Sequence, residues 1–342
     1  MLSLKANMTN MFRSSSISKA TLTSVSRLQV STRNVSTVAP AEIEKFLQRH
    51  RTDKVLPVDA SWYMPNVPMN GFNEFQKERF NKDAVFFDID KISDHSSPYP
   101  HMLPSQKSFE NIVGQLGINN DTLLLLYDKQ GIFSLCRAAW MFEIFGHDPE
   151  KLFILNTFPS YKQSFADPNL IMVVHEMINR LETTVVTKPS PHEPVTYKAT
   201  FDPSKVVSYE KILKLAQKGE IGKSVTLIDA RSHDRFTGAV GEPRAGISSG
   251  HVPGAVNLPF NELLTPNKSF LSKMSLQSVL KEHKIDESKP IIVMCGTGVT
   301  ACVLRTGLIL AGFNQDNIAV YDGSWTEWAM RVPEQLIAKG ES

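Results

Sequence analysis

The residues of this sequence with the clearest potential for chemistry gather around one cysteine. Cys295 follows an apolar run over 290–294 and precedes Gly296, Thr297 and Gly298, after which a helical pattern begins. Glycines let the chain turn tightly with its N–H groups facing inward, and a helix N-terminus carries partial positive charge. Such a turn stabilises an anion on sulfur. The pattern therefore favours a reactive thiolate over a buried structural thiol, which is the usual state of a free cysteine.

The other two cysteines, Cys136 and Cys302, lie within apolar helical patterns, where free cysteine packs like a small hydrophobic side chain. The total of three cysteines is odd, which argues against a disulfide-stapled secreted domain. The sequence thus predicts one reactive and two structural thiols in a reducing compartment.

A cysteine-dependent phosphatase is one function that a thiolate at such a turn could serve. That reaction needs an arginine six positions after the cysteine, because its planar fork clamps phosphate through two hydrogen bonds. The corresponding residue here is Ala301. This excludes the phosphatase interpretation.

Short apolar runs and helical patterns alternate around Cys295. We predict strands over 225–228, 255–259, 290–294 and 318–321, since runs of this kind suit a parallel sheet buried on both faces. One helix is predicted over 209–218 with Ser208 as its cap, and another over 299–311, ending at Gly312. The second of these is apolar almost all round and should be buried. The alternation predicts an α/β domain.

The first half of the chain repeats these signals. The sequence V-D-A over 58–60 corresponds to I-D-A over 228–230, 170 residues later. Aligning the glycines of the two later turns, Gly131 and Gly298, places Asp128 opposite Cys295. The chain is therefore predicted to be a tandem duplication in which only the second copy has a thiol at the strand end.

The domain boundaries follow from composition. A polar stretch with three prolines separates the two copies and is predicted to be an extended linker over 183–200. We place the N-terminal domain at 41–182 and the C-terminal, cysteine-bearing domain at 201–338.

Residues 1–38 are interpreted as a mitochondrial transit peptide. Up to residue 40 there are five basic residues, many serines and threonines, and no acidic residue. A disordered basic tail is the alternative, and an additional cytoplasmic pool stays open. The sequence thus predicts a mitochondrial protein, with the matrix as its destination.

The overall composition argues against two classes of partner, although a local basic patch for nucleic acid stays open. The net charge of the whole chain is +2, so nothing favours direct nucleic-acid binding by bulk charge. No run approaches the roughly 18 apolar residues needed to span a membrane. We expect neither nucleic acid nor a membrane as a partner.

Six motifs, taken in order, resemble those of the two-domain rhodanese-type sulfurtransferases. They are D-A-S-W-Y-M-P over 59–65, R-F-x-G over 235–238, E-P-R-x-G over 242–246, G-H-V-P-G-A-V-N-L-P-F over 250–260, C-G-T-G-V-T-A over 295–301 and Y-D-G-S-W-x-E-W over 321–328. The resemblance implies tandem rhodanese-like α/β domains, each a mainly parallel sheet flanked by helices. It also implies an enzyme whose cysteine takes sulfane sulfur from a donor, becomes a persulfide and passes the sulfur to a nucleophile.

The loop after the cysteine bears on the donor. Thiosulfate sulfurtransferases typically have C-R-K-G there, which suits a dianion, whereas C-G-T-G resembles the C-G-S-G loop of 3-mercaptopyruvate sulfurtransferases. The resemblance implies 3-mercaptopyruvate as the donor, with thiosulfate as the alternative. Thioredoxin, a small thiol or cyanide would take the sulfur, and no metal or organic cofactor is implied.

The resemblance also implies which residues bind the donor. Arg235 and Arg244 match the family's substrate-binding arginines, whose planar forks suit a carboxylate beside a ketone. Asp229 ends a strand six residues before Arg235 and is predicted to pair with it. The loop positions implied in binding are Gly296, Gly298, Val299 and Thr300.

In mercaptopyruvate enzymes a Ser, a His and an Asp form a relay that resembles a protease triad. By motif, the corresponding residues are Thr297, His101 and Asp90. Their implied role is to move the proton of the donor thiol while sulfur passes to Cys295. Because His101 and Asp90 belong to the first copy, the site is predicted to lie between the domains.

Some residues near these motifs are expected to be structural. His251 opens a Pro-Gly turn, and Trp325 and Trp328 are predicted to pack at the sheet edge.

A non-enzymatic sulfur carrier, serving a partner such as a tRNA-thiolation system, is the alternative from another functional class. A passive carrier has no need of the two arginines and the relay, which disfavours it.

Overall fold

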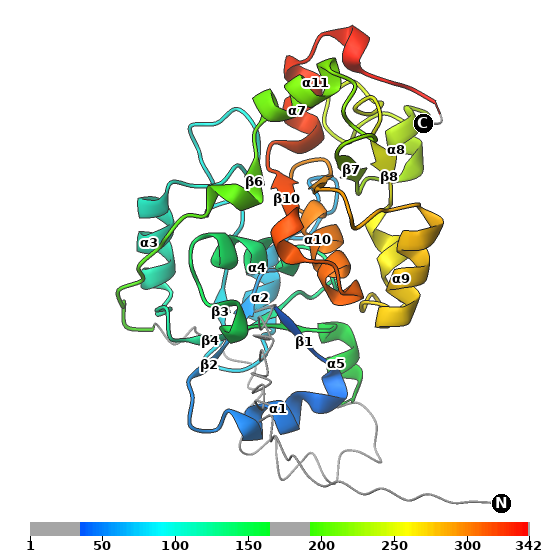
Figure 1. Cartoon of the computed structure of the whole chain (residues 1–342). Coiled ribbons are helices and arrows are strands. Elements are labelled where there is room, and N and C mark those ends of the chain that lie inside the picture. Colours follow the sequence, from blue (N-terminus) through cyan, green and yellow to red (C-terminus); the bar gives the residue numbers. More distant parts are fainter. Residues whose placement is uncertain (1–34, 165–191, 341–342) are drawn as a thin grey trace, which may run out of the picture. The chain divides into compact units, whose positions relative to one another are not determined.

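Two five-stranded parallel sheets form the core of the protein (Figure 1). The computed structural model describes residues 35–164 and 192–340, and both sheets belong to the single unit Arg33–Ser342. The first sheet has the order β1-β5-β4-β2-β3 and the second the order β6-β10-β9-β7-β8. The identical order confirms the predicted α/β duplication.

The strands of the first sheet are β1 (Ser36–Val38), β2 (Val55–Asp59), β3 (Val85–Phe86), β4 (Leu123–Tyr127) and β5 (Leu152–Leu155). Those of the second are β6 (Val206–Val207), β7 (Thr226–Asp229), β8 (Val256–Asn257), β9 (Ile291–Met294) and β10 (Ile318–Tyr321). Each central strand is an apolar run buried on both faces, as β9 illustrates, because helices cover both sides of a parallel sheet. The strands predicted in the second half are confirmed.

The helices of the first half are α1 (Ile43–Arg49), α2 (Gly71–Lys77), α3 (Gln106–Gln115), α4 (Leu135–Ile144) and α5 (Phe158–Ser164). Those of the second half are α7 (Tyr209–Gln217), α8 (His233–Thr237), α9 (Lys273–Glu282), α10 (Ala301–Ala311) and α11 (Ser324–Arg331). No helix within the described residues is both long and apolar enough to cross a membrane.

Local signals set the ends of the helices. The side chain of Ser208 caps α7 by accepting the backbone N–H of Lys211. Gly312 ends α10 in the left-handed conformation with φ 107°. Helix α10 begins at Ala301, two residues later than predicted, because the chain is still turning through Gly298 with φ 78°.

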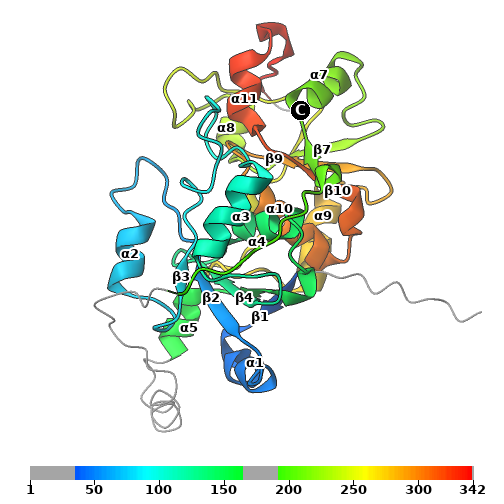
Figure 2. The ribbon, with the colours of Figure 1, turned by 90° about the vertical axis from the view of Figure 1, so that its left-hand side faces the viewer.

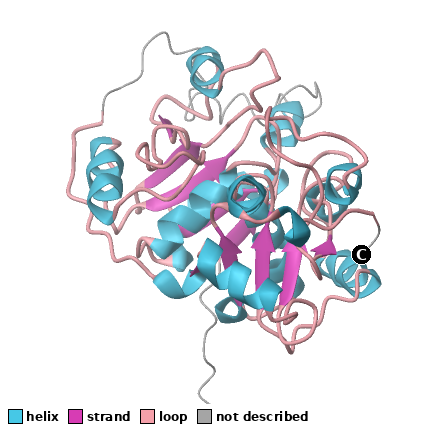
Figure 3. Ribbon diagram, turned by 90° about the horizontal axis from the view of Figure 1, so that it is seen from above, coloured by secondary structure: helices cyan, strands magenta, loops and turns pink. Residues whose placement is uncertain are grey.

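Helices α4 and α10 join the two halves. They lie side by side and pack against each other (Figure 2). Almost every side chain of both is buried. Seen from above, helices fill the space between the two groups of strands (Figure 3). One continuous apolar core therefore contains residues of both sheets, such as Leu124 of β4 and Val293 of β9.

The part of the predicted linker that the structure describes, residues 192–200, runs against the first half without forming a helix or strand. Val195 donates its backbone N–H to Gly114, and the ring of Tyr197 is buried beside Phe109. The remainder of the linker, 183–191, lies outside the described residues.

The end of the predicted transit peptide overlaps the fold. Residues 1–34 lie outside the described part, but Ser36–Val38 form β1 and pair with β5. The side chains of Val35 and Val38 are buried. A leader that ended at residue 38 would remove this strand, so the boundary compatible with the sheet lies before Val35.

A chain that starts at residue 39 should unfold at a lower temperature than one that starts at residue 35. It loses β1 and two buried valines, and burying two such side chains stabilises by about 3–5 kcal/mol. Differential scanning calorimetry of the two chains makes the comparison, with Val38→Ala in the longer chain expected to fall between them. Equal midpoints would show that β1 contributes nothing to stability.

Candidate active site

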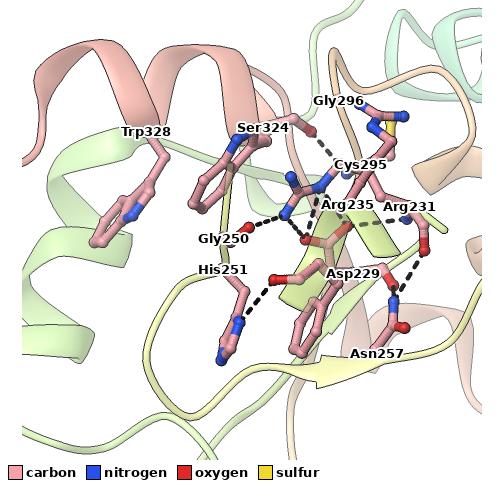
Figure 4. Close-up of polar contacts among 12 residues, drawn as sticks. Asp229, Arg231, Arg235, Gly250, His251, Asn257, Cys295, Gly296, Ser324 and Trp328 are labelled. Atoms are coloured by element: carbon pink, nitrogen blue, oxygen red, sulfur yellow. Dashed lines mark hydrogen bonds and ion pairs between the residues drawn. The ribbon is translucent and has the colours of Figure 1, made fainter. Parts of the chain in front are cut away.

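Cys295 leaves the carboxyl end of β9 and is 2% exposed. Its backbone is fixed by the start of α11, where Ser324 Oγ accepts the Cys295 N–H at 3.1 Å and the Cys295 carbonyl accepts the Trp325 N–H at 2.9 Å. The Gly296 carbonyl accepts both the N–H and the hydroxyl of Thr326. Figure 4 shows Ser324 beside the cysteine. The first turn of α11 therefore holds the cysteine loop in one conformation.

The two glycines of the loop are needed for different reasons. Gly298 has φ 78°, and a Cβ there would meet Arg137 Nη1 and the Asp322 carbonyl at 2.8 Å. At Gly296 a Cβ would lie 3.2 Å from Arg235 Nη2, so this glycine lets a guanidinium approach the loop. One glycine provides the turn and the other provides room beside the cysteine.

The structure brings the three relay residues into one hydrogen-bonded chain. His101 Nδ1 lies 2.9 Å from Thr297 Oγ1, and His101 Nε2 lies 2.8 Å from Asp90 Oδ1. Thr297 and His101 are 196 residues apart in the sequence. His101 is 4% exposed and has φ 63°, which is uncommon for a residue with a side chain and is typical of a constrained functional position.

The electrostatics of the relay assign its protons. The hydrogen bond from His101 lowers the pKa of Asp90, so Asp90 is a carboxylate at neutral pH and accepts the Nε2 proton. Burial lowers the pKa of His101, although Asp90 opposes this shift, and the imidazole is therefore neutral at neutral pH. Nδ1 then carries a lone pair and accepts the hydroxyl proton of Thr297.

The two arginines differ in their pairing. Arg235 in α8 binds Glu242 through Nε at 3.1 Å and through Nη2. Arg244 is half-buried and has no hydrogen bond or ion pair to any described residue. Burial, followed by the repulsion of Arg235, lowers the pKa of Arg244 below its usual value. A half-buried guanidinium without a partner is suited to bind an anion.

The prediction that Asp229 pairs with Arg235 is wrong. Both oxygens of Asp229 are taken by Arg231, whose Nη2 lies 2.5 Å from Oδ2 (Figure 4). Arg231 follows Asp229 by two residues, just past the end of β7, and both side chains are fully buried. Glu242 forms ion pairs with both Arg231 and Arg235. Asp229 is therefore linked to Arg235 only indirectly, through Arg231 and then Glu242.

A pocket of about 560 Å³ lies over the relay. Asp90 and His101 line it from the first half, and Arg244, Thr326 and Met330 line it from the second. Cys295 does not line this pocket, but Arg244 interacts electrostatically with both Cys295 and Asp90. The unpaired arginine thus connects the pocket to the buried cysteine.

Comparisons with known proteins identify the family of the chain. A rhodanese-like domain model matches residues 209–331. The chain is 36% identical over 312 residues to thiosulfate sulfurtransferase TUM1 of Saccharomyces cerevisiae, covering 88% of this chain and 97% of that protein. It is 39% identical over 286 residues to 3-mercaptopyruvate sulfurtransferase of Rattus norvegicus, covering 83% of this chain and 88% of that protein. The chain belongs to the rhodanese family of sulfurtransferases.

Solved structures of relatives share the tandem rhodanese fold. The crystal structure of yeast Tum1 matches with a TM-score of 0.79 at 35% identity, covering 90% of this chain and 99% of that chain. A sulfur transferase subunit of yeast mitochondrial complex I matches with a TM-score of 0.75 at 41% identity, covering 90% of this chain and 100% of that chain.

The last two residues predicted to bind the donor, Val299 and Thr300, offer little side-chain surface to a substrate. Val299 is 3% exposed and belongs to the apolar core, so only its backbone is free to meet a substrate. Thr300 is half-buried at the start of α10 and makes no capping hydrogen bond with its side chain. Both contribute to the loop mainly through the backbone.

Sequence reasoning missed the residue that links the two rhodanese domains at the site. Arg137 of α4 is 1% exposed, forms an ion pair with Asp322 at 2.7 Å and donates to the His101 carbonyl at 2.5 Å. Its Nη1 also reaches the Gly298 carbonyl at 3.5 Å. The available signal was a lone arginine within an otherwise apolar helical pattern.

Other residues around the site are structural, as predicted. The ring of His251 stacks on Phe236 at 3.9 Å, and its Nδ1 lies 2.9 Å from the Phe236 carbonyl. Trp325 and Trp328 are fully buried in the core of the second domain. Cys136 and Cys302 are also fully buried, and burial raises the pKa of Cys302 to about 12.

Replacing Arg137 with leucine should lower the free energy of unfolding by about 3–5 kcal/mol, because Asp322 would stay buried without its cation. Urea unfolding followed by circular dichroism measures this. Lys162→Leu is the matched control, since it breaks an exposed pair with Glu78 and should cost less than about 1 kcal/mol. The double variant Arg137→Leu/Asp322→Asn should recover part of the loss. Equal losses from Arg137→Leu and Lys162→Leu would contradict this account.

Proposed function

We propose that the protein is a 3-mercaptopyruvate sulfurtransferase in which Cys295 receives the sulfur and holds it as a persulfide. One observation carries the proposal: the loop beside Cys295 contains a hydroxyl, on Thr297, that is bonded to a neutral histidine. Two arginines near the loop provide the positive charge, and the loop itself has none. This arrangement suits a monoanionic thiol donor whose proton must be moved.

The reaction begins with attack of the Cys295 thiolate on the donor sulfur. The S–S bond of the persulfide forms as the carbon–sulfur bond of 3-mercaptopyruvate breaks, and the electron pair goes to the enolate of pyruvate. The proton of the donor thiol passes through Thr297 and His101 to the enolate carbon, which gives pyruvate and a persulfide anion. Asp90 keeps His101 in the tautomer that accepts this proton.

The arginines hold the donor in place for this step. Arg244 has its whole guanidinium free to bind a carboxylate, while Arg235 uses Nε and Nη2 on Glu242 and keeps Nη1 for the ketone or carboxylate. A thiol acceptor, thioredoxin or cyanide then attacks the outer sulfur and restores the Cys295 thiolate.

Transfer of sulfur from thiosulfate is the second candidate, and it is favoured by the relative named thiosulfate sulfurtransferase at 36% identity. Delivery of the persulfide to a partner protein, including one of a tRNA-thiolation system, is compatible with either donor. We place the enzyme in the mitochondrial matrix, as a mature chain that keeps β1. Its first domain then runs from Val35 to residue 182, its linker over 183–200 and its second domain over 201–338. The composition of the leader and the mitochondrial name of one relative support this location.

Arg244→Gln and Arg235→Gln should each lower kcat/KM for 3-mercaptopyruvate by roughly 10- to 150-fold, since each removes a charge-assisted bond of about 1.5–3 kcal/mol. Arg49→Gln, an exposed change on α1, is the control. Initial rates with both donors test the proposal. A native protein that turns over thiosulfate faster than 3-mercaptopyruvate would overturn the donor assignment, and unchanged rates in both variants would overturn the arginine clamp.

Cys295→Ser should abolish sulfur uptake. The intact mass of the native protein should rise by one sulfur atom after incubation with donor, and the variant should show no increase. A persulfide on Cys136 or Cys302 would refute the assignment.

The pH dependence should identify His101 as the base. Its pKa lies below the usual 6.5, so kcat/KM should stay level above that pH and fall as the pH drops through the lowered value. Asp90 raises the pKa of His101, so Asp90→Asn should move this fall to still lower pH while reducing kcat. A fall that shifts to higher pH in Asp90→Asn would rule out the relay.

A further inference from the structure

The relay ends on a residue that needs support. The side chain of Asp90 is 61% exposed, although His101, which it orients, is buried. An exposed carboxylate moves between rotamers and water unless a second group holds it. One oxygen of Asp90 binds His101, so support must act on the other.

Trp62 supplies this support. Its indole Nε1–H donates to Asp90 Oδ2 at 3.0 Å, and its ring lies edge-on against His101 with centroids 4.9 Å apart. The indole therefore touches both first-half members of the relay. Trp62 belongs to the D-A-S-W motif, which takes no direct part in the proposed reaction.

The backbone of Trp62 is held in turn by the turn after β4. Its N–H donates to Ser134 Oγ at 3.0 Å, and its carbonyl accepts the side-chain amide of Gln130 at 2.5 Å. Ser134 Oγ lies 2.5 Å from Asp128, which also accepts the backbone N–H groups of Gln130 and Ser134. All of these groups are buried or half-buried.

This turn is the counterpart of the cysteine loop. Asp128 follows the central strand β4 as Cys295 follows β9, and Gly131 takes the left-handed conformation that Gly298 takes. Where the second copy presents a thiol, the first presents a carboxylate bonded within its own turn.

We propose that Trp62 is a positioning residue of the relay and that the turn Asp128–Ser134 holds it in place for the active site of the other domain. The proposal rests on the proposed function, because it assumes that Asp90 and His101 act in sulfur transfer. The first domain, which lacks the cysteine, then contributes to catalysis by holding Asp90 and His101 in position.

Trp62→Phe tests the contact. Phenylalanine keeps an aromatic ring beside His101 but is smaller and lacks the indole N–H, so kcat should fall about tenfold with KM little changed. The decisive measurement is the double-mutant cycle with Asp90→Asn. If Trp62 acts through Asp90, the double variant Trp62→Phe/Asp90→Asn should lose little more kcat than Asp90→Asn alone.

Trp328→Phe is the matched control. It also removes an indole N–H, which donates to the Leu336 carbonyl at 3.3 Å within the core of the second domain, where the ring packs against Tyr209. Its effect on kcat should be small and the same in the native and Asp90→Asn backgrounds. Thermal midpoints of all variants separate loss of folded protein from loss of rate.

A second cycle tests the turn. Ser134→Ala should lower kcat severalfold in the native background and leave it unchanged in the Trp62→Phe background. Thr122→Val, which removes a buried hydroxyl at the opposite end of β4, should leave kcat unchanged in both. The chain has four tryptophans, so the Trp62 indole N–H signal can be assigned by NMR, and it should shift in Asp90→Asn and in Ser134→Ala.

The outcomes separate the two proposals. Native kcat in Asp90→Asn would refute the relay itself. A damaged Asp90→Asn with fully additive effects of Trp62→Phe would refute only the positioning role, and native kcat in Ser134→Ala with an unshifted indole signal would refute the role of the turn.

Discussion

A buried guanidinium is the interaction on which the active site depends. Arg137 extends from α4 of the first domain and binds groups in three other segments. These are the Asp322 carboxylate, the His101 carbonyl and the Gly298 carbonyl. A charge in the interior is stable only while its partners stay in place, so moving any of these segments away would leave a buried cation without compensation. The cysteine loop, the relay histidine and the start of α11 therefore keep their positions together.

The two domains share one architecture but differ in the turn that follows the central strand. The same strand order and the same left-handed glycine form a turn at the end of β4 and β9. In the second domain the glycine after the thiol, Gly296, leaves room for the Arg235 guanidinium beside the loop. In the first domain, a carboxylate whose pKa burial raises to about 7 fills the equivalent position, and its hydrogen bonds close the turn. The shared topology places an equivalent turn at the end of β4 and of β9. The side chains in each turn determine whether it carries a thiol or is closed by its own hydrogen bonds.

Sequence reasoning succeeded where the signal is local. The apolar runs predicted the parallel strands, and the glycines around Cys295 predicted the turn. The relay came from motif resemblance, because nothing in the chain near His101 indicates a left-handed backbone or a partner 196 residues away. The partner of Asp229 was missed because two arginines lie within reach along the chain, and only the packed structure shows that Arg231 turns inward. Arg137 was missed because its neighbours form an apolar helix.

The shared core between α4 and α10 bears on how this chain evolved. Arg305 of α10 binds Glu143 of α4 through two bonds of 2.6 and 2.8 Å, within an apolar contact that neither domain completes alone. A single domain with such a face would expose an apolar surface that favours association, and pairing with a second copy would bury it. In the present chain the first copy has Asp128 where the second has Cys295, and it still buries its apolar face against the second copy. The copy without the cysteine is in this sense a permanently bound subunit.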